Sequence, residues 1–204
     1  MDETRHKSTK KGPALFFSLV LADQTAKLLI SQLAMRDRFS IIPGFLHFHP
    51  VQNRNLSWIA SIADYNTPVA QMIVIQIAAA VVTAIVYGYC VFLSEEKQPH
   101  LSRFLLFFES GILCSFLDVV FWGGSLDFIA LLNWFVFDVK DVYLSLGVIS
   151  LLLFCMDDLQ KYYRLNKEER NRLKKQRGFF QWIKELCRAD GNPARFSGPQ
   201  RRGK

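Results

Sequence analysis

The chain has 204 residues, half of them apolar, and carries a formal net charge of +7. The two features are segregated, because 14 of the 25 Lys and Arg residues follow Leu159 and four precede Gly12. An apolar middle with basic ends is unusual for a soluble basic domain and typical of a membrane protein. The four cysteines form no CxxC pair, so they argue against a zinc or dithiol redox motif.

Four apolar segments are about long enough to cross a membrane, which takes roughly 20 helical residues. In chain order they begin at Pro13, Val69, Leu101 and Asp141, and end at Leu33, Leu93, Trp122 and Asp157–Asp158. We therefore expect an all-α membrane protein with four spanning helices. The basic bias of the two ends predicts that both termini lie in the cytoplasm.

The connections between the predicted spans differ in character. Residues 35–67 mix β-branched and aromatic residues with Pro and Gly, which predicts a small extracytoplasmic β-structure between spans one and two. Residues 161–204 combine Lys and Arg with scattered aromatic residues, which favours a basic cytoplasmic tail on anionic membrane lipid over nucleic-acid binding. The predicted organisation is thus a membrane domain at 1–160 followed by this tail.

Ionisable residues in three of the spans are predicted to lie at similar depth. At a rise of about 1.5 Å per residue, Asp118 and Asp141 lie about 22 and 24 Å above the cytoplasmic interface. On the same scale, Asp23 and Lys27 of span one lie at about 18 and 24 Å. These two are four residues apart and can pair on one helix face. Acids inside spans usually face a protein interior or a water-filled cavity.

Two acids at equal depth on consecutive spans indicate a particular chemistry. Neighbouring carboxyls tend to share a proton, because both cannot ionise cheaply. One then acts as base toward a water, while the protonated one polarises a carbonyl, as in aspartic peptide hydrolysis. The alternative is that each acid snorkels to the outer interface, which suits a single acid near a span end better than four charges in one layer.

Six short motifs follow one another between residues 12 and 158. They are LADQTAK at 21–27, IPGFL at 42–46, Asn53 with Trp58, LD at 117–118, LDF at 126–128 and FDVKD at 137–141. In order and spacing the series resembles the motifs D-Q-x-x-K, P-x-x-L, N-x-G-x-x-F, G-N-x-x-D-R, V-D-F and F-N-x-A-D of lipoprotein signal peptidase, also called signal peptidase II.

This resemblance implies a membrane aspartic endopeptidase in the bacterial cytoplasmic (inner) membrane, with four spans and an extracytoplasmic β-cradle. Such an enzyme cleaves the signal peptide of a diacylglyceryl-modified prolipoprotein before the modified cysteine, without metal or cofactor. Asp118 and Asp141 are then the implied catalytic pair. The residues implied to support the site or bind the substrate are Asp23, Lys27, Asn53, Asp127 and Asp138.

The chain departs from the family pattern beside both aspartates. Cys114-Ser115 and Val119 stand where the family has Gly-Asn and Arg around the first aspartate. Asp138 and Lys140 stand where the last motif has Asn and Ala. The lost partners motivate an alternative, a catalytically silent relative that binds lipidated proteins as a chaperone or regulator.

A further alternative is a transport or channel component with an ion path through the membrane. Its path would use Asp23, Lys27, Glu109 and Asp118. Span two contains no charged residue, so a continuous path through all four spans is poorly supported.

Overall fold

The computed structural model describes residues 11–54, 68–93, 99–132 and 134–165. Its four long helices are α2 (Lys11–Leu33), α4 (Val69–Leu93), α5 (Pro99–Leu117) and α6 (Val139–Arg164). With the helical turn that extends α5 to Trp122, each is long and apolar enough to cross a membrane. The prediction of four spans is confirmed, and α6 continues several residues beyond its predicted end. The predicted tail beyond residue 165 and Trp58 lie outside the described residues.

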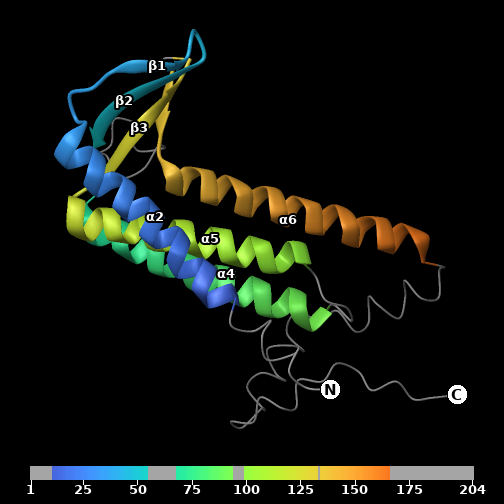
Figure 1. Ribbon diagram of the computed structural model, residues 1–204. Helices are drawn as coiled ribbons and strands as arrows, with labels where there is room; N and C mark the ends of the chain where they lie inside the picture. The colour runs from blue at the N-terminus through green and yellow to red at the C-terminus, as the bar shows by residue number, and fades with distance from the viewer. Residues whose placement is uncertain (1–10, 55–67, 94–98, 133, 166–204) are drawn as a thin grey trace, which may run out of the picture.

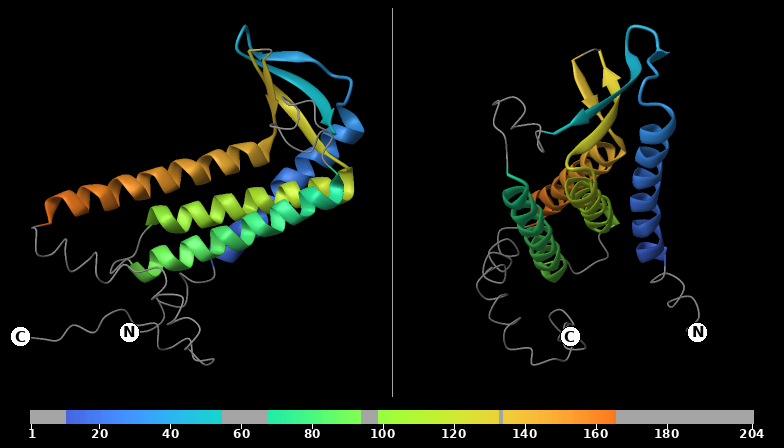
Figure 2. Two further views of the ribbon diagram at one scale, coloured as in Figure 1. Left: turned by 180° about the vertical axis from the view of Figure 1, so that it is seen from behind. Right: turned by 90° about the vertical axis from the view of Figure 1, so that its left-hand side faces the viewer.

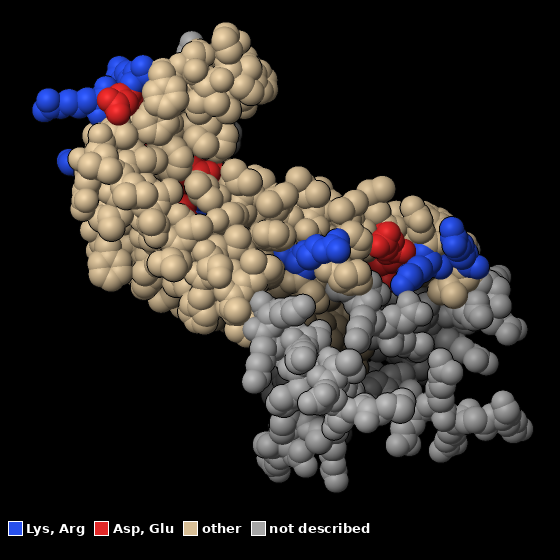
Figure 3. Space-filling model, viewed as in Figure 1, with Lys and Arg blue, Asp and Glu red and all other residues tan. Residues whose placement is uncertain are grey.

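The helices expose many apolar side chains, as expected for helices that are surrounded by lipid and not by water. In α4, Val74 and Val82 are more than half exposed although the helix carries no charge. A helix satisfies its own backbone hydrogen bonds, so an apolar exterior is stable in hydrocarbon. Figure 3 shows a broad face almost without charged side chains between the charged residues at the two ends of the molecule.

The third span ends in a π-helical turn, η1 (Asp118–Trp122), which directly continues α5. Gly123 terminates it in the left-handed conformation at φ 60°, and its neighbour Gly124 has φ 150°. A Cβ at Gly124 would collide with the backbone oxygen of Asn53, so only glycine allows the two segments to approach here. π-turns are often found at functional sites, and this one begins at the buried Asp118.

A four-stranded antiparallel sheet lies at one end of the helices (Figure 1). In spatial order its strands are β1 (Phe39–Ile42), β2 (Leu46–Asn53), β3 (Ser125–Leu131) and β4 (Phe135–Phe137). The predicted β-structure between spans one and two is present, and it is larger than predicted, because the connection between spans three and four supplies β3 and β4. The central pairing of β2 with β3 places Asn53 opposite Ser125.

The helix α5 packs along α6, and two glycines allow the close approach. A Cβ at Gly111 would meet Cγ of Leu144 at 2.6 Å, and one at Gly147 would meet Cβ of Phe108 at 3.0 Å. Near the sheet, a buried cluster of Val20, Cys114 and Tyr143 joins α2 to this pair. Figure 2 shows α4 and α5 side by side, with the sheet above one end of the helices.

Candidate active site

Charged residues of α2, η1 and the start of α6 meet where the helices join the sheet. Asp23 and Lys27 come from α2, Asp118 from η1, and Asp138 from the residue that precedes α6. All four residues are buried, with at most 1% of their surface exposed. In Figure 3, Asp and Glu atoms show at the bottom of a recess between the sheet and the helices. The recess therefore leads to a buried ionic cluster.

Lys27 lies at the centre of this cluster and contacts three carboxylates. Its Nζ is 2.9 Å from Oδ2 of Asp23, which forms the predicted pair one helical turn away. The same nitrogen is 2.6 Å from Oδ2 of Asp118 and 2.7 Å from Oδ2 of Asp138. One buried ammonium group thus ties α2 to the end of span three and the start of span four.

Asp118 accepts hydrogen bonds at both carboxylate oxygens. Lys27 donates to Oδ1 at 2.8 Å as well as to Oδ2, and Gln24 Nε2 donates to Oδ1 at 3.2 Å. Lys140 Nζ is 3.2 Å from Oδ2. The Gln24 side chain also donates to Asp23 and accepts from the indole N–H of Trp122, at 3.0 and 3.2 Å, so its orientation is fixed.

Lys140, in the first turn of α6, is a second buried ammonium group. Its Nζ is 2.6 Å from Oδ2 of Asp138 and 3.7 Å from Oδ1 of Asp127, and it donates to the hydroxyl of Ser125. Its backbone N–H donates to Oδ1 of Asp23 at 3.1 Å. The residue therefore links α6 to β3 and to span one at the same time.

Asp138 and Asp141 cap the N-terminus of α6 through a reciprocal pair of hydrogen bonds. The Asp141 backbone N–H donates to Oδ1 of Asp138, and the Asp138 N–H donates to Oδ2 of Asp141, both at 3.2 Å. This capping box satisfies two N–H groups that have no partner within the helix. It also fixes the side chain of Asp141, which is partly exposed, beside the cluster.

Asp127 is held by its strand neighbours. Asn53 Nδ2 donates to its Oδ2 at 3.2 Å, and Ser125 Oγ donates to its Oδ1 at 2.6 Å. One oxygen each of Asp127, Asp138 and Asp141 lies within 4.8 Å of the others. Three clustered carboxylates can bind a cation, but here the Lys140 ammonium already contacts two of them.

Asp127 and Asp138 lie just outside the spans, and their pKa values are shifted in opposite directions. Burial raises the pKa of Asp127 above its ordinary value, although Lys140 and the hydrogen bond from Ser125 oppose that rise. Burial also acts to raise the pKa of Asp138, but the ammonium groups of Lys140 and Lys27 outweigh it and hold that pKa below its ordinary value.

The structure gathers all seven residues predicted for the site, but it does not place the predicted pair in contact. Among the described residues, no hydrogen bond or ion pair joins Asp118 directly to Asp141; Lys140 and Asp138 link them instead. The residues not predicted are Gln24, Ser125 and Lys140. The Gln of the D-Q-x-x-K motif is a signal for the first, and the joint departure of Asp138 and Lys140 from the last motif is a signal for the third. Nothing in the sequence places Ser125 against Asp138.

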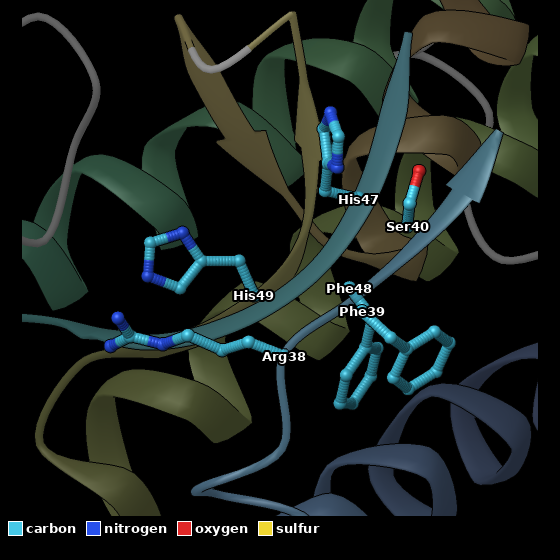
Figure 4. Close-up of a pocket in the computed structure, with 6 residues that line it drawn as sticks. All are labelled: Arg38, Phe39, Ser40, His47, Phe48 and His49. Carbon is cyan, nitrogen blue, oxygen red and sulfur yellow. The ribbon is translucent and has the colours of Figure 1, made fainter. Parts of the chain in front are cut away.

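Two other polar groups lie apart from the cluster. His47 and His49 of β2 line a cavity of about 270 Å³ with Arg38 and Ser40, and Figure 4 shows Phe39 and Phe48 directed to the other side of the strands. Within the described part of the chain, Oε1 of Glu109, a residue of span three, is buried and has no hydrogen-bond partner.

The fold and the site together define a polytopic membrane protein with ionisable side chains buried at the ends of its spans. A family model described as signal peptidase (SPase) II matches residues 15–165, and the chain belongs to this family of membrane peptidases. The predicted family is thereby confirmed. Comparison with curated protein sequences gives no match.

Solved structures share the fold. A bacterial membrane enzyme determined by the in meso method at 2.3 Å resolution has 23% identity and a TM-score of 0.58, covering 77% of this chain and 94% of that one. Another so described, at 1.9 Å, has 22% identity and the same TM-score, covering 73% and 94%. At these identities the similarity establishes the common fold.

Proposed function

We propose that the chain is an aspartic endopeptidase that cleaves the signal peptide from diacylglyceryl-modified prolipoproteins in the bacterial cytoplasmic membrane. Family membership supports the reaction class. Four apolar helices support a substrate that reaches the site from the bilayer, because its acyl chains stay in hydrocarbon while the peptide enters the recess beneath the sheet (Figure 3).

The observation that carries this proposal is the charge balance of the buried cluster. Five carboxyls, those of Asp23, Asp118, Asp127, Asp138 and Asp141, meet two ammonium groups. Full ionisation would leave an excess of negative charge in a site shielded from water, so the cluster favours keeping a proton on a carboxyl. A retained proton beside ionised carboxylates is what aspartic peptide hydrolysis requires.

In this mechanism Asp118 and Asp141 act on opposite sides of the scissile peptide. One activates a water molecule, and the other, protonated, donates a hydrogen bond to the carbonyl oxygen. Asp23, Lys27 and Asp138 hold the pair in place, while Asn53 and Asp127 line the sheet side of the site. No step requires a metal or cofactor.

The competing function is a silent relative that binds lipidated proteins. It is favoured by one observation, that the oxygens of Asp118 are already engaged by three donors and so are not free for water. In an active enzyme a donor must yield when substrate and water enter. Cleavage by the purified protein decides between the two functions.

The test is cleavage of a diacylglyceryl-modified prolipoprotein by the full chain in detergent or lipid nanodiscs. We expect Asp118→Asn and Asp141→Asn each to lower kcat by at least about 100-fold, the usual range for loss of a general acid or base. The matched control is Asp37→Asn, since Asp37 is exposed on the turn after α2 and lies outside the cluster.

Each outcome has a clear meaning. Loss of cleavage in both cluster variants, with the Asp37→Asn protein active and all samples folded, supports the peptidase and the pair together. A folded unmodified protein that binds the lipidated substrate but never cleaves it would replace the proposal with the silent relative.

A further inference from the structure

Lys140 occupies a position where a cation is ordinarily unfavourable. It lies in the first turn of α6, and the positive end of a helix dipole repels an ammonium group. The residue is also almost fully buried, at 7% exposure. Three carboxylates, those of Asp138, Asp118 and Asp127, lie within ion-pairing distance and compensate both effects. This placement indicates that the Lys140 ammonium group stabilises the negative charge of the carboxylates around it.

The described contacts of Asp118 are with hydrogen-bond donors. Oδ1 accepts from Lys27 and Gln24, and Oδ2 faces the ammonium groups of Lys27 and Lys140. A protonated carboxyl would point its own hydrogen at one of these donors, so the arrangement fits the ionised form. From the other packed elements, Asp23 of α2 contacts Lys27, while Asp138 contacts both ammonium groups.

Asp141 has the opposite surroundings. Within the described part of the chain no ammonium group forms an ion pair with it, and its hydrogen-bond donor is the backbone N–H of Asp138. Oxygens of Asp127 and Asp138 lie within 4.8 Å of one of its own. The Lys140 ammonium also acts on Asp141 electrostatically, but within the described residues it contacts Asp118 and not Asp141. Like charges this close favour the protonated form of one member.

We propose that Lys140 is a positioning residue that, together with Lys27, holds Asp118 ionised, so that Asp118 is the base of the pair and Asp141 carries the proton. This assignment rests on the proposed function for its catalytic meaning. Lys140 replaces the Ala of the last family motif, and Asp138 replaces its Asn. This chain therefore carries a pair of opposite charges where the motif has two neutral residues.

The assignment gives a balanced reaction. Water adds to the scissile carbonyl carbon as Asp118 takes one of its protons, and Asp141 gives its proton to the carbonyl oxygen. When the tetrahedral intermediate collapses, the C–N bond breaks, Asp118 passes its proton to the leaving amine and Asp141 regains its own. At 3.2 Å, the contact of Lys140 with Asp118 is longer than its 2.6 Å contact with Asp138, so Lys140 can release Asp118 to water while keeping a partner.

The first test is the pH profile of kcat/KM for Lys140→Ala against Lys140→Arg. Without the ammonium, Asp118 is protonated more readily, so we expect the acid limb of the Ala profile to move to higher pH by about one unit or more. The Arg variant keeps the charge, and its acid limb stays near that of the unmodified protein. A merely structural role would lower the rate at every pH and leave the limb unmoved, which would overturn the proposal.

A second measurement does not depend on cleavage. In full-length protein labelled with ¹³C at aspartate carboxyls, the Asp118 signal, assigned by its loss in Asp118→Asn, should report the ionised form from neutral to mildly acidic pH. In Lys140→Ala it should move to the protonated position at the acid end. A protonated Asp118 in the unmodified protein would refute the assignment, whether or not the chain is a peptidase.

A double variant provides the test if Lys140→Ala alone does not fold. Lys140→Ala alone leaves Asp138 and Asp127 short of one partner, whereas Asp138→Asn with Lys140→Ala removes one charge of each sign. Asn also preserves the helix cap. We expect the double variant to fold and, compared with Asp138→Asn alone, to show the displaced acid limb and the ¹³C change, because that comparison removes only the ammonium group. An Asp118 signal that is the same in the folded double variant and in Asp138→Asn would also contradict the proposal.

Discussion

Asp138 combines two tasks that are usually carried by separate residues. One carboxylate oxygen caps α6 by accepting from the Asp141 N–H, and the other faces the ammonium groups of Lys27 and Lys140. Replacing an N-cap with Ala costs about 1 kcal/mol, and leaving a buried ammonium without its partner costs more. The start of span four therefore depends on this one side chain both for its backbone and for its charge balance.

The two tasks can be separated by comparing Asp138→Asn with Asp138→Ala. Asn keeps the cap and loses the charge, so we expect it to destabilise the protein less than Ala does, by about 1 kcal/mol. Thermal unfolding in detergent, followed by circular dichroism, measures the difference. Equal stability of the two variants would show that the cap contributes nothing.

The pH dependence of the same variants follows from the lowered pKa of Asp138. A carboxyl whose pKa is lower in the folded than in the unfolded state stabilises the fold above its unfolded pKa and loses that contribution as pH falls through the folded pKa. The stability advantage of the unmodified protein over Asp138→Asn should thus be full near neutral pH and shrink below about pH 4. An advantage that grows on acidification would contradict the ion pairs.

At the scale of residues, the sequence predicted what depends on local spacing. Asp23 and Lys27 are four residues apart on one helix, and they pair. The convergence of Asp118 with them followed from depth along the spans. The role of Lys140 could not be predicted in this way, because it depends on where α6 begins and on β3 placing Ser125 and Asp127 within reach.

At the scale of elements, the approach of α5 to α6 carries the site. Gly111 faces Leu144 and the backbone oxygen of Lys140, at 2.6 and 3.3 Å from an added Cβ. The helix contact therefore sets the position of the first turn of α6, which carries the second aspartate. A change in this packing should affect stability and catalysis together.

Gly111→Ala tests this dependence. Overpacking of a close contact costs typically about 1–3 kcal/mol, so we expect a lower unfolding temperature and a lower kcat. Gly12→Ala is the matched control, because an added Cβ at Gly12 of α2 meets nothing within 4 Å. Equal unfolding temperatures and equal activity for the two variants would show that α6 adjusts freely to the bulk at Gly111.

Elements differed in how well the sequence predicted them, for a physical reason. In a membrane, the charge-free apolar run of α4 is expected to form a spanning helix. Its predicted bounds, Val69 and Leu93, match the structure. The strand β3 (SLDFIAL) is a short apolar run, which periodicity cannot assign with certainty. Two spans separate it from its partner β2 in the chain, so the pairing was not visible locally.

At the scale of the whole molecule, the orientation of the spans is a prediction that labelling can test. Starting from a protein whose cysteines are replaced by Ala or Ser, Arg38→Cys adds a thiol before β1 and Lys161→Cys adds one near the end of α6. We expect a membrane-impermeant maleimide to label Arg38→Cys in intact cells from outside and Lys161→Cys only after the membrane is opened. The reverse pattern would place the basic tail outside the cytoplasm.

The sheet also has a consequence for how the protein is made. Spans two and three lie between β2 and β3 in the chain. The β2–β3 pairing, and with it the sheet beside the ionic cluster, therefore cannot form until most of the protein has been synthesised and inserted. Span one enters the bilayer much earlier, and its Asp23 and Lys27 can neutralise each other during that wait. A nascent chain stalled before α6 lacks Lys140 and Asp141, so the ionic site is complete only when the last helix is present.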